Sequence, residues 1–178
     1  MCGISGILAK SDTPSLQTLI SRTNDRMSHR GPDADGFFVE EGIALGHRRL
    51  SILDLSSAAN QPFSDDSGRF VMVFNGEIYN FNEIKVQLPD YPFRTTSDTE
   101  VILAAFVKWG PSCLDKMRGM FALAIWDRKE RSLFLARDRF GVKPLYYFKD
   151  RDHLVFASEI RAILASGVVP RKLNRSAL

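Results

Sequence analysis

Cys2, directly behind Met1, brings together two groups that can react with each other. Once Met1 is removed, this residue carries a thiol and a free α-amine. A model α-amine has a pKa of about 7.7–8.0, so part of it is uncharged near neutral pH. Such an amine can serve as the base for a neighbouring nucleophile without any histidine. The position predicts a catalytic nucleophile, and a buried strand cysteine is the alternative that it leaves open.

Asn75 and Gly76 follow the apolar run at 70–74. A side-chain amide beside a glycine N–H supplies two donors for a developing oxyanion. Glycine also lets the backbone turn sharply and approach a substrate closely. However, Asn-Gly is the strongest two-residue hairpin signal. The pair therefore predicts either an oxyanion-binding site or a hairpin turn where the strand ends.

Arg49 and Asp98 are candidates for binding charged groups of a substrate. A planar guanidinium can hold a carboxylate through two parallel hydrogen bonds. Because side chains alternate along a strand, Arg48 and Arg49 point to opposite faces and only one of them can face a site. Asp98 could bind a substrate ammonium. A surface ion pair for Arg49 and a helix cap for Asp98 remain the alternatives.

The other reactive residues show no pattern typical of a cofactor site. Cys113 is expected to pack as a small hydrophobe. His29, His47 and His153 lack the spacing to cysteines or carboxylates that a metal site needs. No glycine-rich loop has the spacing of a phosphate-binding motif. The sequence therefore predicts no metal site and no ATP site within these residues.

The bulk composition predicts one ordinary globular domain. The chain has 178 residues, of which 44% are hydrophobic and 25% charged. The net charge of +3 is dispersed, which argues against a nucleic-acid partner. No apolar run approaches the ~18 residues of a membrane span. Two cysteines form no disulfide framework, so a cytoplasmic location is expected.

Apolar periodicity predicts the elements that must position these residues. Strands are expected at 2–8, 36–40, 43–49, 70–74, 121–126, 133–137, 145–148 and 154–157. The last four form two consecutive hairpins, which indicates antiparallel pairing. Helices are expected from Pro14, with Asp12 or Thr13 as the cap, and at 83–88 and 159–164. Together these elements predict a layered α+β domain.

A further helix is expected to begin within 96–100. Either Ser97 or Asp98 can cap it. Glu100 stands three residues after Ser97, so the two predict a capping box.

Six motifs together resemble one known family. They lie, in that family's order, at 1–6, 29–33, 49–52, 75–80, 97–100 and 137–146. Over essentially its whole length, 1–178, the chain resembles the class II glutamine amidotransferase domain in its asparagine-synthetase branch. The resemblance implies a four-layer αββα sandwich of the N-terminal-nucleophile type, with two mostly antiparallel sheets.

The resemblance also implies the catalytic roles. Cys2 is the expected nucleophile and its own α-amine the base, while Asn75 and Gly76 form the oxyanion hole. Glutamine is then hydrolysed to glutamate and ammonia through a Cys2 thioester. In the family, the motif that contains Arg30 borders the exit for ammonia.

Substrate-binding roles follow from the same motifs. Arg49 is expected to hold the α-carboxylate of glutamine, and Asp98 the α-amino group with help from Glu77. The backbone around Leu50 and Ile52 is expected to line the same pocket.

The family normally supplies its ammonia to an ATP-dependent synthetase domain, by default for asparagine synthesis from aspartate. That domain, in the same or a partner chain, is expected to hold ATP and Mg²⁺, whereas this one needs no cofactor. The tail at 170–178 reads as the start of a further helix, so the chain is expected to be an amino-terminal portion of a longer enzyme. A homodimer is compatible with the resemblance. The alternative is a non-catalytic regulatory module that retains only the fold.

Overall fold

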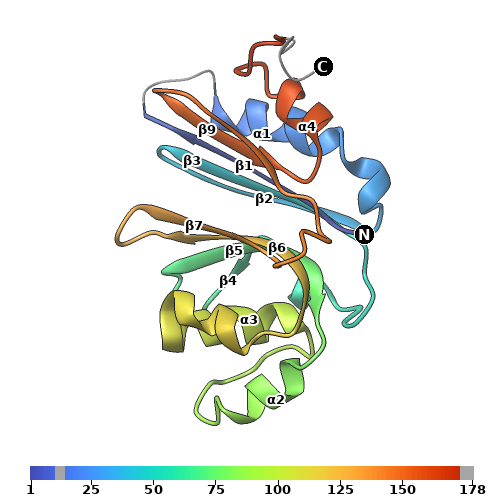
Figure 1. Ribbon diagram of the computed structural model, residues 1–178, viewed down its shortest axis with the longest axis vertical. Coiled ribbons are helices and arrows are strands. Elements are labelled where there is room, and N and C mark those ends of the chain that lie inside the picture. Colours follow the sequence, from blue (N-terminus) through green and yellow to red (C-terminus); the bar gives the residue numbers. More distant parts are fainter. Residues whose placement is uncertain (11–14, 173–178) are drawn as a thin grey trace.

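Two antiparallel β-sheets stacked face to face form the centre of the computed structural model, and helices cover both outer faces (Figure 1). The structure describes residues 1–10 and 15–172. The layers follow the order helix, sheet, sheet, helix, which confirms the predicted α+β sandwich. No helix among these described residues is long and apolar enough to cross a membrane.

The first sheet places the amino terminus at its middle strand. Its strands, in spatial order, are β2 (Ala34–Glu40), β3 (Ile43–Arg49), β1 (Gly3–Ala9), β9 (His153–Ala157) and β8 (Tyr146–Lys149). Small residues let β1 be covered on both sides, since a Cβ on Gly6 would come within 2.2 Å of the Phe156 ring. Cys2 directly precedes β1, the middle strand of this sheet.

Two helices, α1 (Leu16–Asp25) and α4 (Ile160–Ala165), cover the outer face of this sheet (Figure 1). The predicted cap residues Asp12 and Thr13, with Pro14, lie outside the described residues. Side-chain alternation at the end of β3 is confirmed. Arg48 turns outward to pair with Asp25 at 2.6 Å, whereas Arg49 is buried.

The second sheet is covered by α3 (Asp98–Trp109), and α2 (Phe81–Val86) packs against α3 (Figure 1). Its order is β4 (Phe63–Ser64), β5 (Phe70–Ile78), β6 (Gly119–Asp127) and β7 (Ser132–Arg137). Short 3₁₀ helices occur at Ser28–Arg30, Ser57–Ala59 and Gly110–Lys116. All four strands that were expected in the second half of the chain are present, with one hairpin in each sheet.

One strand is longer than the sequence predicted. The expected end of the strand at Phe74 is wrong, because β5 continues to Ile78. Asn75 and Gly76 pair with Ala122 and Phe121 of β6, so the hairpin alternative is wrong as well. Pairing with a long neighbouring strand overrides the local turn preference, and no strand returns directly after Gly76.

The start of α3 also corrects a prediction. The Ser97 side chain accepts a hydrogen bond from the Thr99 N–H at 3.1 Å, so Ser97 is the cap. Glu100 completes no capping box. It is fully buried and accepts hydrogen bonds from the backbone N–H groups of Arg94 and Thr95. Asp98, the first residue of the helix, is left free of the capping role.

Apolar side chains fill the space between the two sheets. The buried members of this core are Ile4, Ile43, Leu45, Val71, Val73, Ala122, Ala124, Trp126 and Phe156. Separate apolar clusters lie under the helices on either side. The sandwich core fixes the spacing between the strand that follows Cys2 and the strand that carries Asn75.

Candidate active site

A cavity of about 270 Å³ lies where three parts of the chain meet. These are Cys2, which precedes β1, the end of β5 in the other sheet, and the start of α3. Its volume is just below the ~300–1,000 Å³ typical of small-molecule sites. All eight residues predicted for the site line it: Cys2, Arg49, Leu50, Ile52, Asn75, Gly76, Glu77 and Asp98. Residues far apart in the sequence therefore meet in one place, as predicted.

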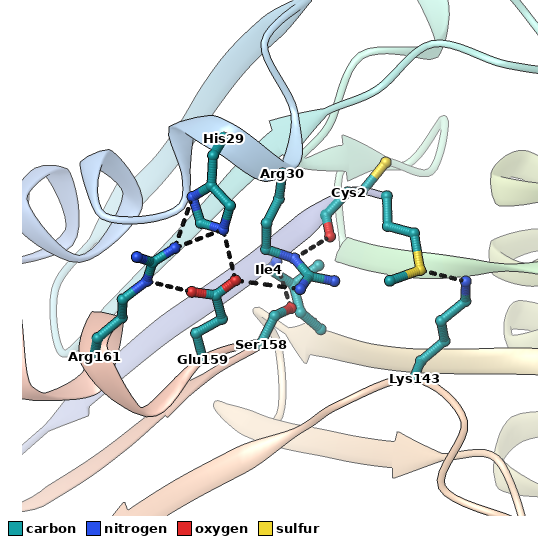
Figure 2. Close-up of polar contacts among 9 residues, drawn as sticks. Cys2, Ile4, His29, Arg30, Lys143, Ser158, Glu159 and Arg161 are labelled. Carbon is teal, nitrogen blue, oxygen red and sulfur yellow. Dashed lines mark hydrogen bonds and ion pairs between the residues drawn. The ribbon is translucent and has the colours of Figure 1, made fainter.

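Cys2 is held by its backbone while its sulfur faces the cavity. The carbonyl oxygen of Cys2 accepts a hydrogen bond from Arg30 Nε at 2.9 Å, and Arg30 also pairs with Glu159 at 3.3 Å (Figure 2). Cys2 Sγ lies 3.4 Å from the backbone N of Leu50. The half-buried thiol is thus presented on a fixed main chain. Met1 is joined to Cys2 in this structure, so the Cys2 amine is part of a peptide bond.

Asn75 presents an unpaired donor. Its side chain is buried, yet Nδ2 has no hydrogen-bond partner among the described residues. Buried polar groups are nearly always paired, so each exception needs an explanation. Because Asn75 lines the cavity beside Cys2, a bound ligand with a negative oxygen would supply the missing partner.

Gly76 supplies a second donor on the same edge of β5. Antiparallel pairing alternates the backbone direction, so the N–H groups of Phe74, Gly76 and Ile78 share one edge. The first donates to Gln61 and the last to Asp98. The Gly76 N–H between them is left for a ligand. A Cβ here would come within 2.3 Å of the Met120 carbonyl oxygen, so only glycine fits.

Arg49 brings a buried positive charge to the cavity. Its side chain donates to the carbonyl oxygens of Ser56 and Asp54 and to Asn60 Oδ1. No carboxylate of the described residues lies within ion-pair distance of the guanidinium, so the surface ion pair is wrong as an alternative. A guanidinium that is held by neutral oxygens keeps its charge available for a substrate carboxylate.

Asp98 brings the opposite charge. It is buried, and Oδ2 accepts a hydrogen bond from the Ile78 N–H at 3.0 Å. Burial raises the pKa of Asp98 to about 6, with a smaller contribution from the nearby Glu77. In the described part of the chain no positive side chain pairs with this carboxylate, and a substrate ammonium can provide that partner. Ser97, not Asp98, caps the helix.

The remaining predicted residues form the wall and rim. Glu77 is half-buried beside Asp98, and Leu50 contacts Cys2 through its backbone. Ile52 is largely exposed and lies at the opening. Cys113 is buried elsewhere and burial raises the pKa of its thiol to about 11, as expected of a packing residue.

Sequence reasoning missed three polar residues at or near the cavity: Gln61, His47 and Lys143. Lys143 is buried and its Nζ lies 3.1 Å from Met1 Sδ, and both residues line the cavity. Lys143 belongs to the motif at 137–146, where a charged residue between Val142 and Pro144 is the signal in the sequence. Within the described residues, no group of three or more histidine, cysteine or acidic side chains could hold a metal ion.

Comparisons with known proteins place this site in a family. A family model described as a glutamine amidotransferase domain matches residues 1–178. Asparagine synthetase [glutamine-hydrolyzing] 2 of Bacillus subtilis is 40% identical over 98% of this chain and 24% of that protein. Asparagine synthetase B of Escherichia coli is 38% identical over 92% of this chain and 30% of that protein. The chain thus spans about a quarter of the length of such relatives.

Solved structures agree on the fold. Glutamine phosphoribosylpyrophosphate amidotransferase of B. subtilis matches 93% of this chain with a TM-score of 0.79 and 23% identity, covering 44% of its own chain. That likeness concerns the fold alone, and it agrees with the layered sandwich described above. Because the family model spans every residue, the chain belongs to the glutamine amidotransferase domain family.

Proposed function

We propose that this chain hydrolyses glutamine to glutamate and ammonia through a thioester on Cys2. The observation that carries the proposal is the unpaired, buried Nδ2 of Asn75 in the same cavity as the Cys2 thiol. Arg49 and Asp98 in that cavity match the α-carboxylate and α-ammonium of an amino acid. Together these groups suit an amino acid whose side chain carries the reacting carbonyl.

The reaction starts from Cys2 as the first residue, after Met1 is removed. The thiol gives its proton to the α-amine and the sulfur attacks the side-chain amide carbonyl of glutamine. Asn75 Nδ2 and the Gly76 N–H hold the oxyanion. The amine then gives the proton to the leaving nitrogen, ammonia departs and a thioester remains. Water, deprotonated by the same amine, releases glutamate and restores the thiol.

We further infer that the ammonia is used by a synthetase domain. The relatives of which this chain covers about a quarter are named glutamine-hydrolysing asparagine synthetases. Aspartate is the proposed acceptor, and ATP with Mg²⁺ is proposed for the synthetase domain only. A cytoplasmic location fits the two unpaired cysteines.

An electrophilic glutamine analogue, a diazoketone, tests the proposal. We expect the protein to have lost Met1 by intact mass, and to gain one analogue, mapped by peptide sequencing to Cys2. Excess glutamine should protect against this labelling. Labelling at Cys113, or none on a chain that lacks Met1, would overturn the proposed reaction and favour a non-catalytic module.

The pKa of Asp98 predicts how glutamine binding depends on pH. Because the folded-state pKa is about 6, the carboxylate is half ionised at that pH and mostly ionised near pH 7. Binding of the substrate ammonium should therefore weaken as the pH falls through about 6. In a Cys2→Ala variant, where no reaction occurs, calorimetry should show this loss. Asp98→Asn should bind ~10–100-fold more weakly at pH 7.5, on the scale of one charged hydrogen bond.

The same titration in Asp98→Asn is the control. Without an ionisable group at this position, the loss of binding near pH 6 should disappear. An unchanged pH dependence in Asp98→Asn would assign the ammonium to another group, of which Glu77 is the nearest candidate.

A further inference from the structure

His47 is a buried polar residue that the proposed mechanism does not use. It lies on β3, opposite Ile4 of β1, and its side chain is fully buried. His47 Nε2 is 3.1 Å from the carbonyl oxygen of Phe74, the residue before Asn75. Since β3 and β5 belong to different sheets, this contact joins the sheet that carries Cys2 to the sheet that carries Asn75.

Both polar groups of the Phe74 backbone are held by side chains. In the described structure, β4 pairs with β5 only at Val71 and Met72, so it offers no partner to Phe74. Instead, Gln61 Oε1 accepts a hydrogen bond from the Phe74 N–H at 2.6 Å, while His47 reaches the Phe74 carbonyl. Two side chains thus replace the hydrogen bonds of a missing neighbouring strand.

The network continues to the ammonium-binding side of the cavity. Gln61 Nε2 donates to Thr99 Oγ1 at 3.4 Å, in the first turn of α3 directly after Asp98. The side chains that bind the Phe74 backbone therefore connect three parts of the site: the sheet that carries Cys2, the strand that carries Asn75, and the start of α3 next to Asp98.

The protonation state of His47 follows from its contacts. A carbonyl oxygen only accepts hydrogen bonds, so Nε2 must carry the proton. Nδ1 is buried and has no partner among the described residues, which suits an uncharged nitrogen. Burial lowers the pKa of His47 to about 3, and the positive charge of Arg49 acts in the same direction. His47 is thus a neutral donor near pH 7 and does not exchange protons with substrate.

Asn75 depends on this support. Its Nδ2 has no hydrogen-bond partner within residues 1–10 and 15–172, so no such bond from the described chain fixes the direction of the donor. The direction of this donor is instead set by the β5 backbone, in which Phe74 directly precedes Asn75. Misplacing a reacting group by about 1 Å can cost ~10²-fold in rate.

We propose that His47 is a positioning residue for the oxyanion site, whose Nε2–H bond to the Phe74 carbonyl holds Asn75 and Gly76 at the correct distance from Cys2. This inference rests on the proposed glutamine hydrolysis. In this role His47 fixes the geometry of the transition state and does not contribute to substrate binding.

Three variants of His47 in the full chain test the role. Glutamine at this position places its Nε2 where the imidazole Nε2 lies, whereas asparagine places its nitrogen near Nδ1, and leucine has no donor. We expect His47→Gln to keep kcat within ~3-fold of the wild type. His47→Asn and His47→Leu should lose ~10–100-fold in kcat, with KM for glutamine changed by less than ~2-fold. Rates are normalised to the number of sites that the Cys2 label counts.

A second measurement separates positioning from general damage. In the γ-aldehyde analogue of glutamine, the Cys2 sulfur adds to the aldehyde carbon. The thiol proton passes to the aldehyde oxygen, which becomes a hydroxyl in the position of the oxyanion. The affinity for this analogue should fall in His47→Asn by about the same factor as kcat, while glutamate binding stays unchanged. Gln61→Met removes the acceptor of the Phe74 N–H and should likewise lower kcat without changing KM. The test therefore does not depend on the folding of one variant.

The outcomes are distinct. Unchanged kcat and aldehyde affinity in His47→Asn and Gln61→Met would overturn the proposal. Parallel losses in kcat, glutamate binding and melting temperature, without rescue by His47→Gln, would also overturn it and make His47 a structural residue only. A wild-type protein that is not labelled at Cys2 and hydrolyses no glutamine would refute the proposed function itself.

Discussion

Cys2→Ala is expected to abolish glutamine hydrolysis, with kcat reduced by at least ~10⁴-fold. The thiol forms the covalent bond in the proposed reaction, and removing the nucleophile of such an enzyme costs about as much as removing the whole catalytic set. Alanine keeps the α-amine, the backbone and the hydrogen bond from Arg30 to the carbonyl oxygen. Glutamate release from glutamine measures the loss.

Two controls make this result specific. Cys2→Ala should still bind glutamine, because Arg49 and Asp98 are unchanged and line the cavity independently of the thiol. Cys113→Ala should keep nearly all activity, since Cys113 is buried away from the cavity with a raised thiol pKa. Residual hydrolysis by Cys2→Ala above ~1% of the wild type would show that the sulfur is not the nucleophile.

Asn75→Ala is expected to reduce kcat by ~10²–10³-fold, which corresponds to ~2.7–4 kcal/mol of transition-state stabilisation from one oxyanion donor. KM for glutamine should change little, because the developing oxyanion exists only in the transition state. The free protein should tolerate the change well, since Nδ2 has no partner among the described residues. Steady-state kinetics and a thermal melt of the same sample measure both effects.

Asn75→Asp is the matched variant. It keeps the shape of the side chain but replaces the donor with an acceptor, so its kcat should be at least as low as that of Asn75→Ala. If Asn75→Asp kept near wild-type activity, the amide would not be an oxyanion donor and Gly76 would be left as the only donor identified.

Local patterns predicted much of the sandwich. Apolar alternation with short polar turns located the hairpins of β2–β3, β6–β7 and β8–β9, because these strands pair with their neighbours in sequence. The same reasoning failed at Asn75-Gly76. There the strand continues because β6, more than forty residues later, pairs with it as far as Ile78 and Gly119. A local turn signal carries no information about such a partner.

The site was also predicted only in part: its charged and reactive residues were predicted, but not the residues that support them. The motifs led to residues that carry charge or reactivity, and these meet in one cavity. The supporting residues were not found, because His47, Gln61 and Lys143 act through contacts with segments distant in sequence. Glu100 shows the same limit: its spacing from Ser97 suggested a cap, but its burial under the loop at Arg94 decides its contacts.

The position of the Met1 side chain has a consequence for freshly made protein. Met1 lines the cavity proposed for glutamine, and its Sδ lies 3.1 Å from Nζ of Lys143, another lining residue. The cavity stays open beside the Met1 side chain, so a molecule that keeps Met1 lacks the free α-amine of the proposed reaction but keeps the space for glutamine. Such immature molecules are expected to bind glutamine through Arg49 and Asp98 but not to hydrolyse it. Saturation binding by glutamine then counts all folded molecules of a preparation, and the hydrolysis rate per bound glutamine reports the fraction that has lost Met1.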